Sequence, residues 1–334
     1  MKRKKIVIGT RGSKLALWQS EWVKDEILRL SPDIEIELRK IKTTGDKILD
    51  VPLAKVGGKG LFVKEIEEAL LRKEIDLAVH SMKDVPTAIP KGLHLAAICK
   101  REDPRDAFIS QLEKGKQAQG EIIFKYKTLK DLPEGARLGT SSLRRACQLL
   151  SIRPDLQIIQ LRGNLDTRFR KLDEGQFDAM ILAAAGIKRL GWQHRITEIL
   201  PFEISLPAIG QGAIGIECRI DDDFINSLIH PLNDCKTSIE VIAERAFLKK
   251  LEGGCQVPIA AHARLLDGKL VIDGLVGSLN GDRLIKGHIE DTLSNSPAGS
   301  KGIIDKAERL GIALAEDLLN RGAKEILDEV YKKY

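Results

Sequence analysis

The sequence of 334 residues is poor in aromatic side chains, which make up 4% of it, and it contains no long apolar run. So few aromatic residues disfavour a surface built on base stacking. A membrane-spanning helix needs about 18 consecutive apolar residues, and no segment approaches that length. The basic start at residues 1–5 is followed by three apolar residues and then Gly9, so no signal peptide is predicted.

Cysteine and histidine are too scattered for a disulfide framework or a metal site. The cysteines are odd in number and widely spaced, with no Cys-x-x-Cys pair, and the six histidines form no cluster with metal-ligand spacing. We therefore expect no metal. Reduced cysteines are typical of the cytosol, so we expect a cytoplasmic protein.

The charge balance is mildly basic, with 54 Lys and Arg against 48 Asp and Glu. A net charge of +6 is too small to indicate nucleic-acid binding by itself, but it suits an anionic ligand if the cations gather in one cleft. The content of 43% hydrophobic and 31% charged residues is typical of a globular protein. At roughly 150 residues per domain, the length predicts two or three domains.

Short apolar runs alternate with helical patterns through the first two thirds of the chain. Strands are predicted at residues 6–10, 34–41, 76–80, 93–98, 136–140, 156–161 and 177–183, and helices at 15–30, 62–72, 143–151 and 166–173. This alternation favours an α/β fold with mainly parallel sheets. The pattern is interrupted at residues 101–130 and 204–215, where we expect one unit to give way to another.

The last hundred residues have a different pattern. A helix is predicted at residues 237–251 and another at 303–319. Between them, alternating segments are separated by Asp267-Gly268 and Asn280-Gly281, and Asn-Gly is a strong hairpin signal. These features predict a smaller C-terminal α+β domain with an antiparallel sheet.

Basic and hydroxyl residues follow almost every predicted strand of the α/β part. Ligands of open α/β sheets bind outside the carboxyl ends of the strands. A Ser or Thr at a helix N-cap makes an anion site, and arginine binds a carboxylate through two hydrogen bonds. One such site is usually an ordinary helix start, but five or six at equivalent strand ends predict a cation-lined cleft for a ligand with several negative groups. The residues are Arg11, Ser13, Lys83, Thr140, Ser142, Arg144, Arg145, Arg162, Gly163, Arg168 and Arg189.

Asp84 and Cys255 each allow two interpretations. Asp84 is either a structural residue, as a partner of Lys83 or part of a turn, or a carboxylate among cations that stabilises a positive intermediate or moves a proton. Cys255 is either a small buried side chain, as most lone cysteines are, or a thiol that its Gly-Gly loop holds toward the cleft.

A glycine-rich segment lies at residues 45–61. It lacks the spacing of a P-loop and contains no GxGxxG motif. The better interpretation is a mobile lid hinged by glycine. Its residues of interest are Lys55, Gly57, Gly58 and Lys59.

Four segments together resemble the porphobilinogen deaminase family, whose members are also called hydroxymethylbilane synthases. They are VHSMKDVP at 79–86, LGTSSLRR at 138–145, LRGN at 161–164 and LEGGCQVP at 251–258. The resemblance extends from about Ile6 to the C-terminal helix. It implies two periplasmic-binding-protein-like α/β domains that flank a cleft, and a third α+β domain that carries a cysteine. We expect domain 1 at residues 1–104 and 211–233, domain 2 at 105–210 and domain 3 at 234–334.

The resemblance also implies an activity. Members of this family are transferases of porphyrin and heme biosynthesis that join four porphobilinogen molecules head to tail, release ammonia and yield the linear tetrapyrrole hydroxymethylbilane. Their catalytic aspartate, which assists the loss of ammonia and stabilises an azafulvenium cation, matches Asp84. Their dipyrromethane cofactor is bound by a thioether to a cysteine that matches Cys255. Most of the strand-end residues above match the family's carboxylate-binding positions, residues 57–60 match its flexible loop, and the expected state is a monomer.

The stretch at residues 110–129 departs from the family, because it is longer and more polar than this region usually is. A rival interpretation is a non-catalytic two-domain protein that binds an anion, but it gives no role to Asp84 or Cys255. Nucleic-acid binding by residues 137–170 is less favoured, because the arginines lie at strand ends and not along one helix face.

Overall fold

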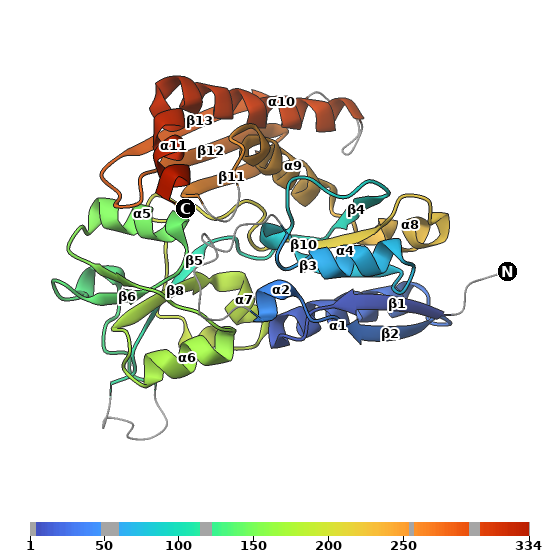
Figure 1. Cartoon of the computed structure of the whole chain (residues 1–334), viewed down its shortest axis with the longest axis horizontal. Coiled ribbons are helices and arrows are strands. Elements are labelled where there is room, and N and C mark those ends of the chain that lie inside the picture. The colour runs from blue at the N-terminus through green and yellow to red at the C-terminus, as the bar shows by residue number, and fades with distance from the viewer. Residues whose placement is uncertain (1–4, 48–59, 114–121, 254–256, 294–300, 334) are drawn as a thin grey trace.

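The computed structural model describes residues 5–47, 60–113, 122–253, 257–293 and 301–333. The chain forms three units, each built on its own sheet (Figure 1). In Figure 1 the first unit lies at the lower right in blue, the second at the lower left in green, and the third at the top in orange and red.

The first sheet has the strand order β2-β1-β3-β10-β4. Strands β2, β1 and β3 are parallel, whereas β10 runs antiparallel to both of its neighbours. The apolar side chains of this sheet, such as Ile6, Leu77 and Ile216, are fully buried. The strands are β1 (Lys5–Thr10), β2 (Glu35–Lys40), β3 (Leu77–Ser81), β4 (Leu93–Ile98) and β10 (Ile214–Arg219), and the helices are α1 (Lys14–Leu30), α2 (Thr44–Lys47), α4 (Lys64–Leu71) and α8 (Asp223–Ile229).

The second sheet repeats this arrangement in the order β7-β6-β8-β5-β9. Here β5 is the reversed strand, antiparallel to both β8 and β9. Four of the five strands in each sheet therefore share one direction, which confirms the predicted α/β class with mainly parallel sheets. The strands are β5 (Asp106–Ser110), β6 (Arg137–Gly139), β7 (Gln157–Ile159), β8 (Ala179–Ala183) and β9 (Glu198–Ile199), and the helices are α5 (Leu143–Ile152), α6 (Leu165–Asp173) and α7 (Ala184–Arg189).

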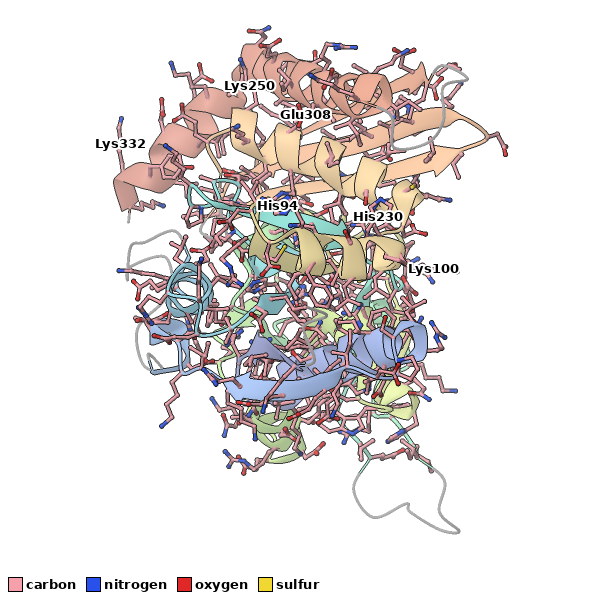
Figure 2. The ribbon with its side chains drawn as sticks, turned by 90° about the vertical axis from the view of Figure 1, so that its right-hand side faces the viewer. His94, Lys100, His230, Lys250, Glu308 and Lys332 are labelled. Carbon is pink, nitrogen blue, oxygen red and sulfur yellow. The ribbon has the colours of Figure 1, made fainter. Side chains whose placement is uncertain are left out.

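The third unit is an antiparallel sheet in the order β11-β12-β13, with helices packed on it. Both predicted turns are confirmed, since Asp267-Gly268 joins the first two strands and Asn280-Gly281 lies between the last two. Helix α9 contacts both β11 and β4, so it joins the third unit to the first, as the side view also shows (Figure 2). The elements are α9 (Cys235–Lys250), β11 (Ile259–Leu266), β12 (Lys269–Gly277), β13 (Leu284–Thr292), α10 (Lys301–Leu318), η5 (Leu319–Ala323) and α11 (Lys324–Lys333).

The chain crosses between the first two units twice, from β4 to β5 and from β9 to β10. The predicted break at residues 101–130 is wrong in part, because β5 occupies residues 106–110 within it. Its apolar core, Ala107 to Ile109, is fully buried but too short to form a recognisable period. The second predicted break overlaps the start of β10 at Ile214. The proposed domain boundaries stay a prediction.

Candidate active site

Asp84 lies in a pocket at the carboxyl end of the first sheet. It ends the short helix η1 (Met82–Asp84), which directly follows β3. The pocket is also lined by Arg11, Ser13 and Phe62, which follow β1 or precede α4 in the sequence. Three segments that are distant in sequence therefore meet at one point, as strand ends of an α/β sheet are expected to do.

The Asp84 carboxylate makes no hydrogen bond or ion pair with the residues that the structure describes. Its charge nevertheless acts on the ammonium group of the adjacent Lys83. Burial lowers the pKa of Lys83 to about 8, against the charge of Asp84, which raises it. Arg145 and Arg168 of the second unit lower this pKa as well. The first and second units therefore bring their charges together at this point.

Ser13 and Arg11 are arranged as their positions in the sequence suggest. Ser13 is the N-cap of α1, and its hydroxyl accepts a hydrogen bond from the Ala16 N–H at 3.3 Å. The Arg11 guanidinium lies 4.3 Å from the centre of the Phe62 ring and forms an ion pair with Asp46. Burial acts to raise the pKa of Asp46, but hydrogen bonds from Arg11 and Thr43 outweigh it, so the pKa is lowered.

The second unit presents a similar strand end at Thr140. Ser142 is the N-cap of α5, and its backbone N–H donates to the Thr140 hydroxyl at 3.2 Å. Gly163 has a φ of +104°, and a Cβ there would lie 2.7 Å from Cγ2 of Thr167. Glycine is therefore required at this turn. The carbonyl of Gly163 accepts a hydrogen bond from Nε of Arg168 at 2.8 Å.

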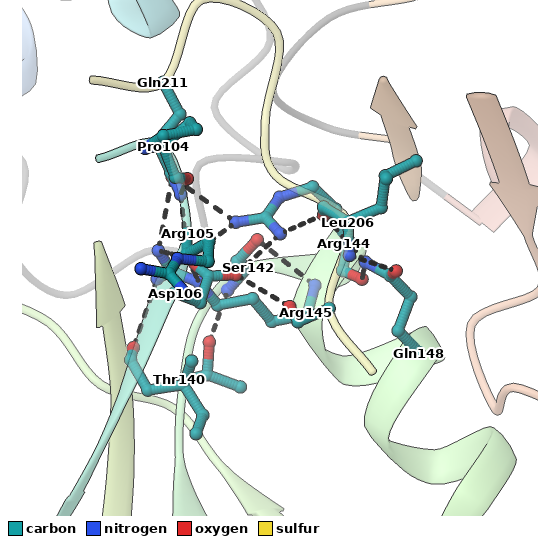
Figure 3. A network of polar contacts seen from close by, with 12 residues as sticks. Pro104, Arg105, Asp106, Thr140, Ser142, Arg144, Arg145, Gln148, Leu206 and Gln211 are labelled. Atoms are coloured by element: carbon teal, nitrogen blue, oxygen red, sulfur yellow. Dashed lines mark hydrogen bonds and ion pairs between the residues drawn. The ribbon is translucent and has the colours of Figure 1, made fainter. Parts of the chain in front are cut away.

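Arg144 and Arg145 converge on one buried carboxylate, Asp106, which sequence analysis missed (Figure 3). Nη1 of Arg144 lies 2.8 Å from Oδ2 of Asp106, and Nη2 of Arg145 lies 2.7 Å from Oδ1. Ser205 and Gln211 also donate to this carboxylate, at 2.7 and 2.9 Å. Burial alone would raise the pKa of Asp106, but the two arginines hold it far below its usual range. Much of the charge of this arginine pair is therefore neutralised within the protein.

Arg162 and Arg168 differ from that pair. Arg162 makes no hydrogen bond or ion pair with the described residues, and burial lowers its pKa. Burial also lowers the pKa of Arg168 to about 10, with a further contribution from Arg145 and Arg162, while Asp84 acts to raise it. These two cations are the ones best suited to receive an anionic ligand next to Asp84.

Arg189 lies at the end of α7 and contacts the crossing segment. Its Nη2 donates to the carbonyl of Gly212 at 2.6 Å, and burial lowers its pKa to about 10. The neighbouring Lys188 pairs with Glu102 and Asp103 of the other crossing, at 3.2 and 3.3 Å. In this structure Arg189 therefore binds the connection between the units and is absent from the lining of the Asp84 pocket.

Five of the predicted site residues lie outside the described residues. They are Cys255 and the loop residues Lys55, Gly57, Gly58 and Lys59. The other cysteines are described. Cys99, Cys147 and Cys218 are buried, and burial raises the pKa of each thiol to about 12, whereas Cys235 is exposed.

Two family models match this chain. The one described as "Porphobilinogen deaminase, dipyromethane cofactor binding domain" matches residues 6–227, and "Porphobilinogen deaminase, C-terminal domain" matches residues 238–320. The chain belongs to the porphobilinogen deaminase family. This membership confirms the hydroxymethylbilane synthase activity, the transferase class and the dipyrromethane cofactor that the sequence predicted, and it disfavours the non-catalytic alternative.

Curated porphobilinogen deaminases are similar to this chain over its whole length. The protein of Geobacter metallireducens is 56% identical over 333 residues, which cover 100% of this chain and 97% of that protein. The protein of Carboxydothermus hydrogenoformans is 51% identical over 328 residues, with 98% of each chain covered.

Solved structures of binding proteins are similar to a lesser degree. The probable amino-acid ABC transporter extracellular-binding protein ytmK of Bacillus subtilis is 12% identical, with a TM-score of 0.39, over 69% of this chain and 90% of that one. The periplasmic VFT2 domain of Bordetella pertussis BvgS is 14% identical, with a TM-score of 0.37, over 68% and 84%.

The residues around Asp84 fit the dipyrromethane cofactor of the porphobilinogen deaminase family. A dipyrromethane carries several carboxylates, and Arg162 together with the outer nitrogens of Arg168 has no anionic partner among the described residues.

The described residues contain no group of three or more His, Cys, Asp or Glu side chains that could hold a metal ion. They also contain no helix that is long and apolar enough to cross a membrane.

Proposed function

We propose that Asp84 is the catalytic carboxylate with which this chain condenses four porphobilinogen molecules into hydroxymethylbilane. The observation that carries this proposal is the position of Asp84 in a pocket with Arg11 and Ser13, without a hydrogen bond or ion pair from any described residue. A structural aspartate in a turn would normally accept such bonds.

The role of Asp84 follows from the charge that develops in the reaction. Loss of ammonia from porphobilinogen leaves a positive charge on the substrate, and an aspartate is ionised at neutral pH. A carboxylate that is already in place stabilises this charge without reorganisation. The same group can assist the proton transfer that accompanies the departure of nitrogen.

The cations of both units would bind the acetate and propionate groups of the pyrroles. Arg162 and the outer nitrogens of Arg168 have the least neutralised charges near Asp84, which favours these two arginines as direct ligands, and Lys83 adds a positive charge beside them. Ser13 and Ser142 are the N-caps of α1 and α5, and the free N–H groups at a helix N-terminus favour an anion. Asp106 fixes the positions of the Arg144 and Arg145 side chains. Thr140 accepts a hydrogen bond from the Ser142 N–H, and Gly163 allows the turn that precedes α6.

We infer that Cys255 carries the cofactor. Bound dipyrromethane supplies a covalently held pyrrole to which each new unit is added. Burial of Cys99, Cys147 and Cys218 disfavours these thiols as attachment points, and Cys235 begins helix α9 on the exposed surface. A role in substrate binding for Lys55, Gly57, Gly58 and Lys59 stays a prediction, because these residues lie outside the described ones.

We further propose that the chain acts as a monomer in the cytoplasm, with the three domains bounded as predicted above. Free buried thiols such as Cys99 and Cys147 are typical of a reducing compartment. The exposed large apolar side chains, such as Leu30, Ile152 and Leu266, come from separate elements. Scattered apolar residues of this kind are ordinary on a monomer.

The experiment that tests this function is incubation of the purified protein with porphobilinogen. The expected result is consumption of porphobilinogen, release of one ammonia per molecule consumed, and formation of hydroxymethylbilane. Binding of porphobilinogen without release of ammonia would instead identify an anion-binding protein.

A further inference from the structure

His80 lies beside Asp84 but faces a second group of charges. It is the fourth residue of β3 and lines the same pocket as Asp84. Its Nε2 lies 3.0 Å from Oε2 of Glu217 on the neighbouring strand β10. His80 is 5% exposed and Glu217 is fully buried, so this contact is shielded from solvent.

Glu67 of helix α4 completes the cluster. It is 8% exposed, and α4 packs against both β3 and β10. Burial and, to a lesser extent, the charge of Glu217 raise the pKa of Glu67 to about 7, and His80 acts in the opposite direction. Near neutral pH the carboxyl group of Glu67 is therefore only partly ionised, which is unusual for a glutamate.

The oxygen atoms of the two glutamates indicate where a proton is needed. Oε1 of Glu67 and Oε1 of Glu217 are both buried without a hydrogen-bond partner among the described residues. Two ionised carboxylates in such surroundings repel each other, and one proton held between them and His80 relieves this repulsion. The other charged groups nearby are Arg11 and Asp84, which share the pocket, and Arg245 of α9, which acts on Glu217.

We propose that Glu67, His80 and Glu217 form a buried proton-exchange site that serves the pocket of Asp84. The inference rests on the proposed function, because that reaction releases a proton at this pocket. His80 is the member that reaches the pocket, and the two glutamates exchange the proton through it without touching the substrate.

The proton balance of the condensation requires such an acceptor. The aminomethyl group arrives as an ammonium and leaves as neutral ammonia when its C–N bond breaks. A C–C bond then forms, and the C–H bond at the attacked pyrrole carbon breaks. One proton is therefore left over for each ring added. An imidazole can accept this proton on Nδ1 while it passes another from Nε2 to Glu217.

The first test measures the proton directly, without substrate. Infrared spectra of the resting protein from pH 5 to 9 report the carbonyl band of a protonated carboxyl group. A band that disappears near pH 7 in the wild type and is absent from Glu67→Gln is expected. In Glu217→Gln, which removes the neighbouring charge, the Glu67 band should disappear at a lower pH.

The second test follows kcat over the same pH range, with Glu68→Gln as the matched control on the more exposed side of α4. Glu67→Gln should lose the change in kcat near pH 7 and reduce kcat on the order of tenfold with KM unchanged. This is less than the 10²–10⁴ typical of a group that transfers the proton directly. The control should keep the wild-type profile.

The outcomes separate this inference from the proposed function. A wild type that releases no ammonia contradicts the function, whatever the spectra show. An active wild type without a carboxyl band near neutral pH, or with the same pH profile as Glu67→Gln, overturns the proton-exchange site alone.

Discussion

The guanidinium group of Arg101 and the carboxylate of Glu244 form a bidentate ion pair that is almost completely removed from solvent. Nη1 lies 2.7 Å from Oε1 and Nη2 lies 3.1 Å from Oε2, with the two side chains 6% and 0% exposed. Glu244 also accepts hydrogen bonds from the N–H groups of Gly210 and Ala263. One carboxylate of α9 thus holds both crossing segments and the sheet of the third unit.

We expect Glu244→Ala to destabilise the protein by about 3–5 kcal/mol, because it leaves the Arg101 charge buried without a partner. The free energy of unfolding in urea measures the loss. Glu316→Ala is the control, since its ion pair with Lys250 is exposed and should contribute at most about 1 kcal/mol. Equal losses for the two variants would show that the buried pair has no special role.

The arginines of the second unit should separate into two classes. Arg144→Leu should destabilise folding by about 3–5 kcal/mol, because Asp106 loses one of its two cations. Arg162→Leu should change stability by less than about 0.5 kcal/mol but weaken substrate binding by about 1.5–3 kcal/mol. Urea unfolding and KM for porphobilinogen measure the two effects.

Arg170→Leu is the control for both arginine variants, since Arg170 is exposed and pairs with Glu174 on the surface of α6. It should change neither stability nor KM appreciably. If Arg162→Leu behaves like this control, Arg162 has no role in binding the substrate.

Asp84→Asn should abolish most of the turnover and leave the fold intact. The amide has the same shape but cannot balance a positive charge, and lost proton-transfer assistance alone typically reduces the rate 10²–10⁴-fold. Release of ammonia measures turnover, and circular dichroism checks the fold. Asp131→Asn, in the short helix η2 (Leu129–Asp131) of the second unit, is the control. Near-wild-type turnover in Asp84→Asn would make Asp84 a structural residue.

The features that the sequence predicted correctly depend on neighbouring residues. The N-caps Ser13 and Ser142 and the turn at Asp267-Gly268 are set by residues within a few positions, so local patterns identify them. Predicted and observed element bounds mostly agree within two residues. The helix predicted to begin at Phe62 begins two residues later, at Lys64, and Phe62 lines the pocket of Asp84.

The features that could not be predicted depend on distant partners. Asp106 contacts side chains 38, 39, 99 and 105 residues away, and nothing next to it in the sequence indicates this. Arg144 and Arg145 therefore looked like free ligands for an anion. Asp46 carried a signal, since it follows the predicted strand at 34–41 in a segment of hydroxyl residues, but its pairing with Arg11 did not follow from that position.

Glu67 should make stability depend on pH. Its folded pKa of about 7 lies above the ordinary value of 4.5, so the folded state holds the proton more tightly than the unfolded state does. Stability therefore falls as pH rises from about 4.5 to about 7 and stays reduced above that range. Glu67→Gln should reduce the difference in the free energy of unfolding between pH 5 and pH 8 by about 1–2 kcal/mol. Urea unfolding at both pH values measures it, and an unchanged difference would contradict the buried titration.

Cys255 should carry a covalent dipyrromethane in the purified protein. The thioether forms when the thiolate attacks the electrophilic carbon left by the loss of ammonia from porphobilinogen, since a thiolate is a stronger nucleophile than a thiol. A dipyrromethane held at Cys255 would supply a free α-position for chain extension, and holding it covalently would make each extension step intramolecular in effect. Intact-mass spectrometry should show a mass above that of the 37.0 kDa chain by two linked pyrrole units.

Cys255→Ala should lack this added mass, and Cys235→Ala is the matched control. Cys235 is the exposed cysteine of the described set, so a reagent that modifies thiols by access alone would label it first. Cys99, Cys147 and Cys218 are buried, and their pKa values of about 12 leave almost no thiolate at neutral pH. Selective attachment at Cys255 would thus not be explained by the exposure of a thiol to solvent alone. An adduct that persists in Cys255→Ala, or an active wild type with the unmodified mass, would refute the assignment.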